Sequence, residues 1–175
     1  GRNPIPLQET LDLQETLFER RITGETPNFM ILAEHEPIYV CNRQDMKDVT
    51  KLFRTNTLPV NLVALSKRRG GSITFHGPGQ LVCYLILRQE DFGIGPKRLV
   101  NTIDEAVIQT LSKFGIKGRT KPADLPVAAS GVWVRTSAGE LKKIASRGMH
   151  ISRGVTRFGF ALNVNTDLSY FDHIY

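Results

Sequence analysis

The chain has 175 residues, 41% of them apolar and 23% charged, which suits one compact domain with a hydrophobic core. This composition excludes a disordered or collagen-like chain. The longest uninterrupted apolar run, Leu81 to Leu87, is too short to cross a bilayer, so we expect a soluble globular domain without a membrane span.

Positive charge is concentrated toward the C-terminal side. Residues 1–60 carry 7 basic and 9 acidic groups, a net −2, whereas residues 61–175 carry 16 and 8, a net +8. This asymmetry favours a negatively charged partner, which charge alone leaves open between nucleic acid, an anionic lipid surface and an acidic protein. Two cysteines are too few for a disulfide scaffold and favour a reducing compartment.

The first third of the chain predicts a helix followed by strands. The helix spans Gln8 to Arg21 and ends at Gly24. Strands are expected at Phe29–Ala33 and Val60–Leu65, with a loop containing a helical turn between them. The expected buried face of the helix consists of apolar side chains, namely Leu11, Leu13, Leu17, Phe18 and Ile22.

The remaining chain predicts a buried strand, a second helix and three more strands. The helix begins at Pro96 and ends at Gly115. Its expected apolar stripe is Leu99, Ile103, Ala106, Val107, Leu111 and Phe114. The strands are expected at Leu81–Leu87, Gly131–Arg135, Lys143–Ile151 and Phe158–Val164. This order predicts an α/β or α+β fold with a mixed sheet and flanking helices, and the absence of repeats or linkers makes residues 1–175 a single domain.

The segment Arg69 to Gln80 is rich in glycine and proline and directly precedes the buried strand at Leu81. Glycines at such a place let the backbone approach a ligand closely. A threonine and a histidine inside the segment, Thr74 and His76, are able to orient a carbonyl or carry a proton. The alternative is a hairpin connection whose glycines serve only the turn.

A second candidate segment runs from Lys142 to Gly148. If Lys143 points into a pocket, burial lowers its pKa and makes it a base or a cation for a thiolate. The alternative is a pair of surface lysines on an edge strand. The sequence has no P-loop, no dinucleotide fingerprint and no zinc-ligand spacing, and its four histidines are scattered, so no metal site is expected.

Together these segments resemble the lipoyl(octanoyl) transferases, the LipB family. The residues that carry the resemblance are Arg69-Gly70-Gly71-x-x-Thr74-x-His76-Gly77-Pro78-Gly79-Gln80, Lys143-Ile144-Ala145-x-x-Gly148 and Gly159-Phe160-Ala161-Leu162-Asn163, in that order. Shorter matches occur at Glu34-His35-x-Pro37-x-Tyr39 and Gly131-Val132-Trp133. The resemblance covers about residues 8–175.

The resemblance implies a fold like that of the biotin and lipoyl protein ligases, and a reaction without a cofactor. An octanoyl group passes from octanoyl-acyl carrier protein to a lysine of a lipoyl domain, in 2-oxoacid dehydrogenases and the glycine cleavage H protein. A cysteine attacks the thioester, and a lysine lowers the pKa of the cysteine thiol. Such chemistry is sound, because a thiolate exchanges readily with a thioester.

The implied site residues follow from the matched motifs. Lys143 takes the place of the lysine that activates the thiol. The residues implied to line the acyl pocket are Arg69, Gly70, Gly71, Ser72, Ile73, Thr74, Phe75, His76, Ser146, Arg147, Gly148, Gly159, Phe160 and Ala161.

The chain departs from the family pattern in two places. The nucleophilic cysteine is expected a few residues after Asp167-Leu168-Ser169, beyond Tyr175, so we expect the given chain to be truncated. Phe158 stands where many members carry histidine. Cys83 reads as a buried structural thiol, and Cys41 follows a strand without a matching motif.

Two alternative functions stay open. An ATP-dependent lipoate or biotin ligase shares the fold and needs no cysteine. A non-catalytic module would bind RNA or an acidic protein through Lys67-Arg68-Arg69, although few aromatic residues accompany this run and no nucleic-acid partner is expected. The expected compartment is the mitochondrion, with the bacterial cytoplasm as the alternative.

Overall fold

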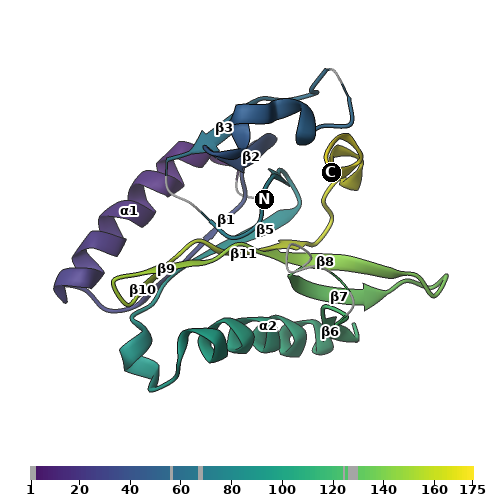
Figure 1. Cartoon of the computed structure of the whole chain (residues 1–175). Helices are drawn as coiled ribbons and strands as arrows, with labels where there is room; N and C mark the ends of the chain where they lie inside the picture. Colours follow the sequence, from purple (N-terminus) through teal and green to yellow (C-terminus); the bar gives the residue numbers. More distant parts are fainter. Residues whose placement is uncertain (1–2, 56, 67–68, 124, 126–129) are drawn as a thin grey trace.

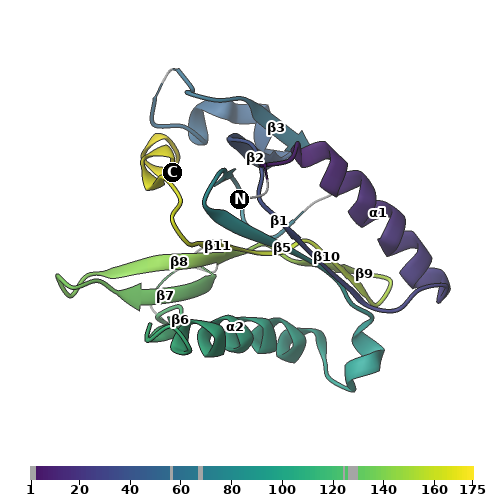
Figure 2. The same cartoon turned by 180° about the vertical axis from the view of Figure 1, so that it is seen from behind.

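The computed structural model describes residues 3–55, 57–66, 69–123, 125 and 130–175, arranged in layers around a central sheet (Figure 1). Helix α2 (Pro96–Ser112) covers one face of this sheet. Helix α1 (Leu7–Thr23) and a smaller sheet lie on the other face, as the view from behind in Figure 2 also shows.

The central sheet has six strands in the order β1-β5-β11-β8-β7-β6, and each neighbouring pair is antiparallel. The middle of the sheet joins segments that are far apart in the sequence, because β11 lies between β5 and β8. The strands are β1 (Phe29–Ala33), β5 (Gln80–Ile86), β6 (Gly118–Thr120), β7 (Gly131–Arg135), β8 (Leu141–Arg147) and β11 (Gly159–Asn163).

The smaller sheet has the order β3-β2-β4 and contains the parallel pair β2–β3. Its strands are β2 (Ile38–Asn42), β3 (Leu62–Leu65) and β4 (Thr74–His76), and a separate hairpin consists of β9 (His150–Ser152) and β10 (Val155–Arg157). Short 3-10 helices are η1 (Asp45–Lys51), η2 (Gln89–Phe92) and η4 (Leu168–His173).

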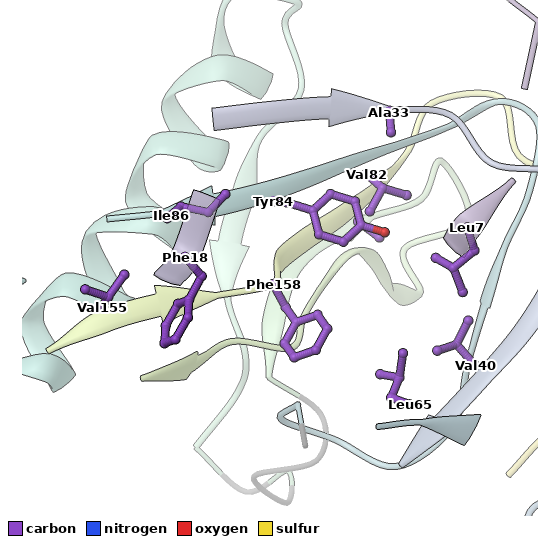
Figure 3. Packing of buried hydrophobic residues seen from close by; sticks show 11 residues of the cluster. Leu7, Phe18, Ala33, Val40, Leu65, Val82, Tyr84, Ile86, Val155 and Phe158 are labelled. Carbon is purple, nitrogen blue, oxygen red and sulfur yellow. The ribbon is translucent and has the colours of Figure 1, made fainter. Parts of the chain in front are cut away.

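The main hydrophobic core lies between the central sheet, α1 and the smaller sheet. Phe18, Ile86 and Val155 are fully buried there, and Phe158 lies near the middle of the cluster (Figure 3). A second cluster under α2 contains Val107, Leu111, Val132 and Ala145. The central sheet is therefore packed on both faces.

The predicted fold class is confirmed, and both long helices lie close to their predicted positions. Three predicted buried residues are exposed: Leu13, Ala106 and Phe114. The reason in α1 is that its buried line includes polar Thr10, Gln14 and Arg21, so the apolar pattern alone misplaces the face. Phe114 lies beyond the end of α2 at Ser112.

The strand predictions need correction at several points. The strand expected at Lys143–Ile151 is two strands, since β8 ends at Arg147 and β9 begins at His150, and between them the backbone of Gly70 packs against Gly148. Strand β2 begins within the Glu34–Tyr39 motif and continues beyond it to Asn42. Cys41 therefore lies inside a strand, whereas the prediction placed it after one. Among the described residues, neither helix is both long and apolar enough to span a membrane.

Candidate active site

A pocket of about 120 Å³ opens between the glycine-rich segment and the α1 face of the central sheet. Most of the residues that the sequence motifs single out lie around it. Its lining includes Arg69 to Thr74, His76, Lys143, Ser146, Arg147, Gly148, Gly159, Phe160 and Ala161. The structure thus brings together three segments that are separate in the sequence.

Two glycines allow the predicted segments to meet backbone to backbone. A Cβ atom added at Gly148 would lie 3.0 Å from the Gly70 carbonyl oxygen, and one added at Gly70 would lie 3.3 Å from the Met149 carbonyl oxygen. Side chains at either position would push the two segments apart. Glycine therefore serves the close packing of these two segments, a role beyond that of a simple turn.

Arg69 organises the glycine-rich segment from within. Its guanidinium donates hydrogen bonds to the carbonyl oxygens of Val40 at 2.9 Å, Ser72 at 2.6 Å and Gly70 at 2.7 Å. Burial lowers the pKa of Arg69 to about 10, so the side chain stays charged at neutral pH. Its Nε atom is buried and has no hydrogen-bond partner within the described part of the chain. Arg69 Nε is thus a buried donor whose hydrogen-bonding capacity is not met by the described residues.

His76 is held in one tautomer by Gln80. Gln80 Nε2 donates to the carbonyl oxygen of Phe75 at 3.2 Å and to Asn163 Oδ1 at 2.9 Å, so Gln80 Oε1 is the atom that faces His76. The 2.6 Å contact to Oε1 therefore requires a hydrogen on His76 Nδ1, which leaves Nε2 as an acceptor. Burial lowers the pKa of His76 to about 3, so the ring is neutral at physiological pH.

A β-bulge turns Lys143 toward the pocket. Val132 pairs with Ala145 while Trp133 pairs with Lys143, so Ile144 is an extra residue in β8. Ile144 and Ala145 both pack in the cluster under α2, and Lys143 then falls on the same face as Ser146. Lys143 Nζ lies 5.5 Å from the centre of the Trp133 ring, and burial lowers the lysine pKa.

Some of the predicted pocket residues direct their side chains elsewhere. Arg147 crosses to the α2 face, where its guanidinium bonds Asp104 Oδ2 at 2.6 Å. Phe160 packs with Cys83 and Ile103 on that same face. Phe75 is absent from the pocket lining and stacks on Tyr170 at a ring distance of 4.2 Å. Arg147 and Phe160 therefore border the pocket with their strand backbones.

Both cysteines point away from the pocket. Cys83 alternates with pocket-lining Val82 and Tyr84 and packs under α2, and burial raises the pKa of its thiol to about 12. Cys41 packs in the cluster between the smaller sheet and η4, and burial also raises the pKa of its thiol. Neither thiol is set up to form a thiolate, in agreement with the structural role predicted for Cys83.

Sequence reasoning missed the apolar wall of the pocket. Val82 and Tyr84 come from β5, where strict alternation identifies the inward positions once the strand is known. The hydroxyl of Tyr84 is 2.8 Å from His35 Nε2, and His35 Nδ1 donates to the carbonyl oxygen of Ile5. The missed lining residues are Leu7, Leu11, Val40, Leu65, Val82, Cys83, Tyr84, Ser130 and Phe158.

The pocket combines an apolar chamber with a few polar groups at one side, an arrangement typical of small-ligand sites. Within the described ranges, no group of three or more histidine, cysteine, aspartate or glutamate side chains is placed to hold a metal ion. Lys67 and Arg68, which belong to the predicted basic run, lie outside the described residues.

Comparison with known proteins matches the family model of the lipoyl protein ligase A/B catalytic domain to residues 6–175. An octanoyltransferase from Bacteroides thetaiotaomicron is 38% identical over 99% of this chain and 76% of its own length. An octanoyltransferase from Thermobifida fusca is 34% identical over 99% of this chain and 70% of its own length.

Solved structures confirm the fold. A T. acidophilum protein assigned as a lipoate protein ligase, with bound lipoic acid, has a TM-score of 0.63 at 16% identity and covers 92% of this chain and 67% of its own. Lipoate-protein ligase A bound with ATP has a TM-score of 0.56 at 16% identity, covering 93% and 66%. These similarities establish the architecture of the pocket-bearing domain.

Proposed function

Because the chain belongs to the lipoyl protein ligase A/B catalytic domain family, we propose that it is an octanoyltransferase acting in protein lipoylation. The observation that carries the proposal is the meeting of Lys143, the Arg69–His76 segment and an apolar chamber at one pocket. The apolar chamber suits the octanoyl chain, and the polar side suits the reacting carbonyl.

The proposed donor is octanoyl-acyl carrier protein, and the proposed acceptor is a lysine of a lipoyl domain. Both kinds of partner are usually acidic, which suits the net +8 charge of residues 61–175. The family name and the relatives' names support octanoyl transfer and lipoyl chemistry. The choice of octanoyl-acyl carrier protein as the donor is part of our proposal.

Lys143 is proposed to stabilise the anionic nucleophile and the negative charge that develops during acyl transfer. Its ammonium is half-buried on the pocket face, where a charge acts more strongly than in water. The charged Arg69 side chain lines the same pocket and adds positive charge near the acyl carbonyl oxygen. Neutral His76, with its Nε2 lone pair, is able to accept a hydrogen bond from the attacking amine.

The nucleophile is not one of the two cysteines of this chain in our proposal. Cys41 and Cys83 face other parts of the molecule, and the pKa of each thiol is raised. The cysteine expected after Tyr175 concerns residues outside this chain and stays a prediction.

A transfer assay tests the proposal. A form of the protein that includes the cysteine predicted after Tyr175 is incubated with octanoyl-acyl carrier protein and an isolated lipoyl domain, and intact-mass measurement follows the lipoyl domain. We expect the gain of one octanoyl group, and none on a lipoyl domain whose acceptor lysine is replaced by arginine. A second arm supplies free octanoate with ATP. Product only in that arm would favour the ligase alternative, and no product in either arm would overturn the proposal.

The binding-module alternative predicts a different result. It requires tight RNA binding that weakens steeply with salt, through the basic run at residues 67–69.

The relatives named above are bacterial, which supports the bacterial cytoplasm over the mitochondrion as the compartment that we propose for the reaction.

A further inference from the structure

A second cavity lies directly beside the acyl pocket. It has a volume of about 260 Å³ and opens between α1 and β3. Half of its lining residues are apolar, including Val63 and Leu65, and half are polar, including buried Gln14 and exposed Asp12. Nothing in the proposed reaction uses this space.

Three residues line both cavities and thus form the partition between them: Leu11, Leu65 and Phe158. Phe158 is the largest of the three and is only 6% exposed. Its ring projects from the central sheet toward Leu65, between Phe18 on one side and Val40 on the other (Figure 3). Removing this ring would leave the two leucines as the remaining barrier.

The backbone of Phe158 is unusual and firmly held. Its φ angle is +58°, in the left-handed region that non-glycine residues rarely adopt. Its N–H donates to Oε1 of buried Gln14 at 2.6 Å, and its carbonyl oxygen accepts from the Leu85 N–H at 2.8 Å. These two bonds fix the direction of the side chain, so the ring forms a rigid part of the partition.

We propose that Phe158 is the end wall of the acyl pocket and sets the length of the acyl chain that the protein accepts. The ring stops the distal end of an eight-carbon chain, and longer chains are refused because the second cavity is closed to them. Leu11 and Leu65 complete the wall. This inference rests on the proposed function, since it takes the first cavity to be the acyl pocket.

Chain-length preference in Phe158→Ala tests the inference. Octanoic and dodecanoic acids are the probes, with binding measured by calorimetry, and octanoyl- and dodecanoyl-acyl carrier protein serve as donors in the transfer assay. We expect the preference for dodecanoic over octanoic acid to rise at least ~10-fold, because each methylene that enters the second cavity leaves water. Ile86→Ala is the matched control, since Ile86 is fully buried in the same core cluster and lines neither cavity.

Each outcome has a definite meaning. A rise in Phe158→Ala without a rise in Ile86→Ala supports the end wall. Two results would overturn the end wall and leave the proposed function standing. In the first, the wild type binds octanoic acid but Phe158→Ala shows an unchanged preference between the two acids. In the second, the preference for dodecanoic acid rises equally in Ile86→Ala. Failure of the wild type to bind or transfer octanoyl groups overturns the proposed function and the inference with it.

Substitutions that keep more of the core guard against loss of folding in Phe158→Ala. Phe158→Leu and Leu65→Ala each open the same partition by a smaller amount, and a rise in both, in the same direction, supports the proposal. An unchanged preference in both, in folded protein that binds octanoic acid, overturns it.

Discussion

The two faces of the central sheet carry different kinds of side chain although the same strands build them. On the α2 face, Cys83, Ala145 and Phe160 pack into apolar clusters with the helix. On the pocket face, their neighbours Val82, Ser146 and Ala161 line a cavity. Adjacent residues thus serve packing or the site according to the direction in which they point, and a motif that covers both faces mixes the two roles.

The largest expected effect is a loss of transfer rate that distinguishes Lys143 on the pocket face from its neighbour Lys142 on the opposite face. Lys143→Ala removes the charge that faces the pocket, so we expect the rate of octanoyl transfer to fall ~100-fold or more with little change in stability. Lys142→Ala is the control, because Lys142 is exposed and pairs with Glu140 at 3.2 Å. Single-turnover rates with octanoyl-acyl carrier protein, in a form of the protein that includes the cysteine predicted after Tyr175, measure both. Equal losses in the two variants would remove Lys143 from the site.

A substitution on the α2 face is expected to change stability and leave chemistry alone. Leu111→Ala empties a buried position under α2 and should lower the free energy of unfolding by about 2–5 kcal/mol. Urea unfolding measures the loss, and the transfer rate per folded molecule should match the wild type. A change in acyl specificity in this variant would show that the two faces are coupled.

Half-buried His76 at the pocket and fully buried His35 predict sensitivity to acid. Burial lowers the folded-state pKa of His76 to about 3 and lowers that of His35, so the unfolded chain binds more protons below pH 6.5. The contribution of His76 is complete above its unfolded pKa of about 6.5 and is lost as the pH falls toward 3. Between these values, His76→Gln should reduce the dependence of unfolding free energy on pH by up to about 1.4 kcal/mol per pH unit.

Urea unfolding at pH 4, 5, 6 and 7 measures this slope. His173→Gln is a matched control, because His173 lies at the end of η4, away from the pocket lining. Identical slopes in wild type and His76→Gln would mean that His76 binds protons equally in the folded and unfolded chain, contrary to its lowered folded-state pKa.

The smallest expected effect belongs to the exposed ion pair on the outer side of α1. Arg153 Nη2 and Glu19 Oε1 lie 2.7 Å apart, and each side chain is about half exposed. Arg153→Ala should therefore cost less than ~1 kcal/mol of stability, because solvent and salt screen such pairs. Thermal unfolding at low and high salt measures it. A larger loss would indicate that the contact of Arg153 with the Phe18 ring contributes to the core.

Much of this architecture was accessible from sequence because its signals are local. The α2 helix follows from Pro96, the stripe of Leu99, Ile103 and Val107, and the stop predicted at Gly115, although the helix already ends at Ser112. The glycine-rich segment and Lys143 stood out through composition and order alone, and the family resemblance joined them into one site. Local signals failed where a partner overrides the pattern, as in α1, where Gln14 is buried because it accepts the Phe158 N–H.

Side-chain direction within the matched motifs was beyond the sequence. One extra residue in β8, at Ile144, decides that Lys143 faces the pocket, and nothing in the motif announces the bulge. Arg147 and Phe160 belong to the motifs yet direct their side chains to the α2 face, because strand alternation puts them opposite Ser146 and Ala161.

The sequence by itself determined the family, the fold class and the segments that meet at the site, since these depend on residue types and their order along the chain. Only the tertiary structure decided which side chains enter the pocket, how Gln80 orients His76, and that Phe158 separates two cavities. The physical reason is that these properties arise from contacts between strands and helices that are distant in sequence, where one residue of register reverses the direction of a side chain.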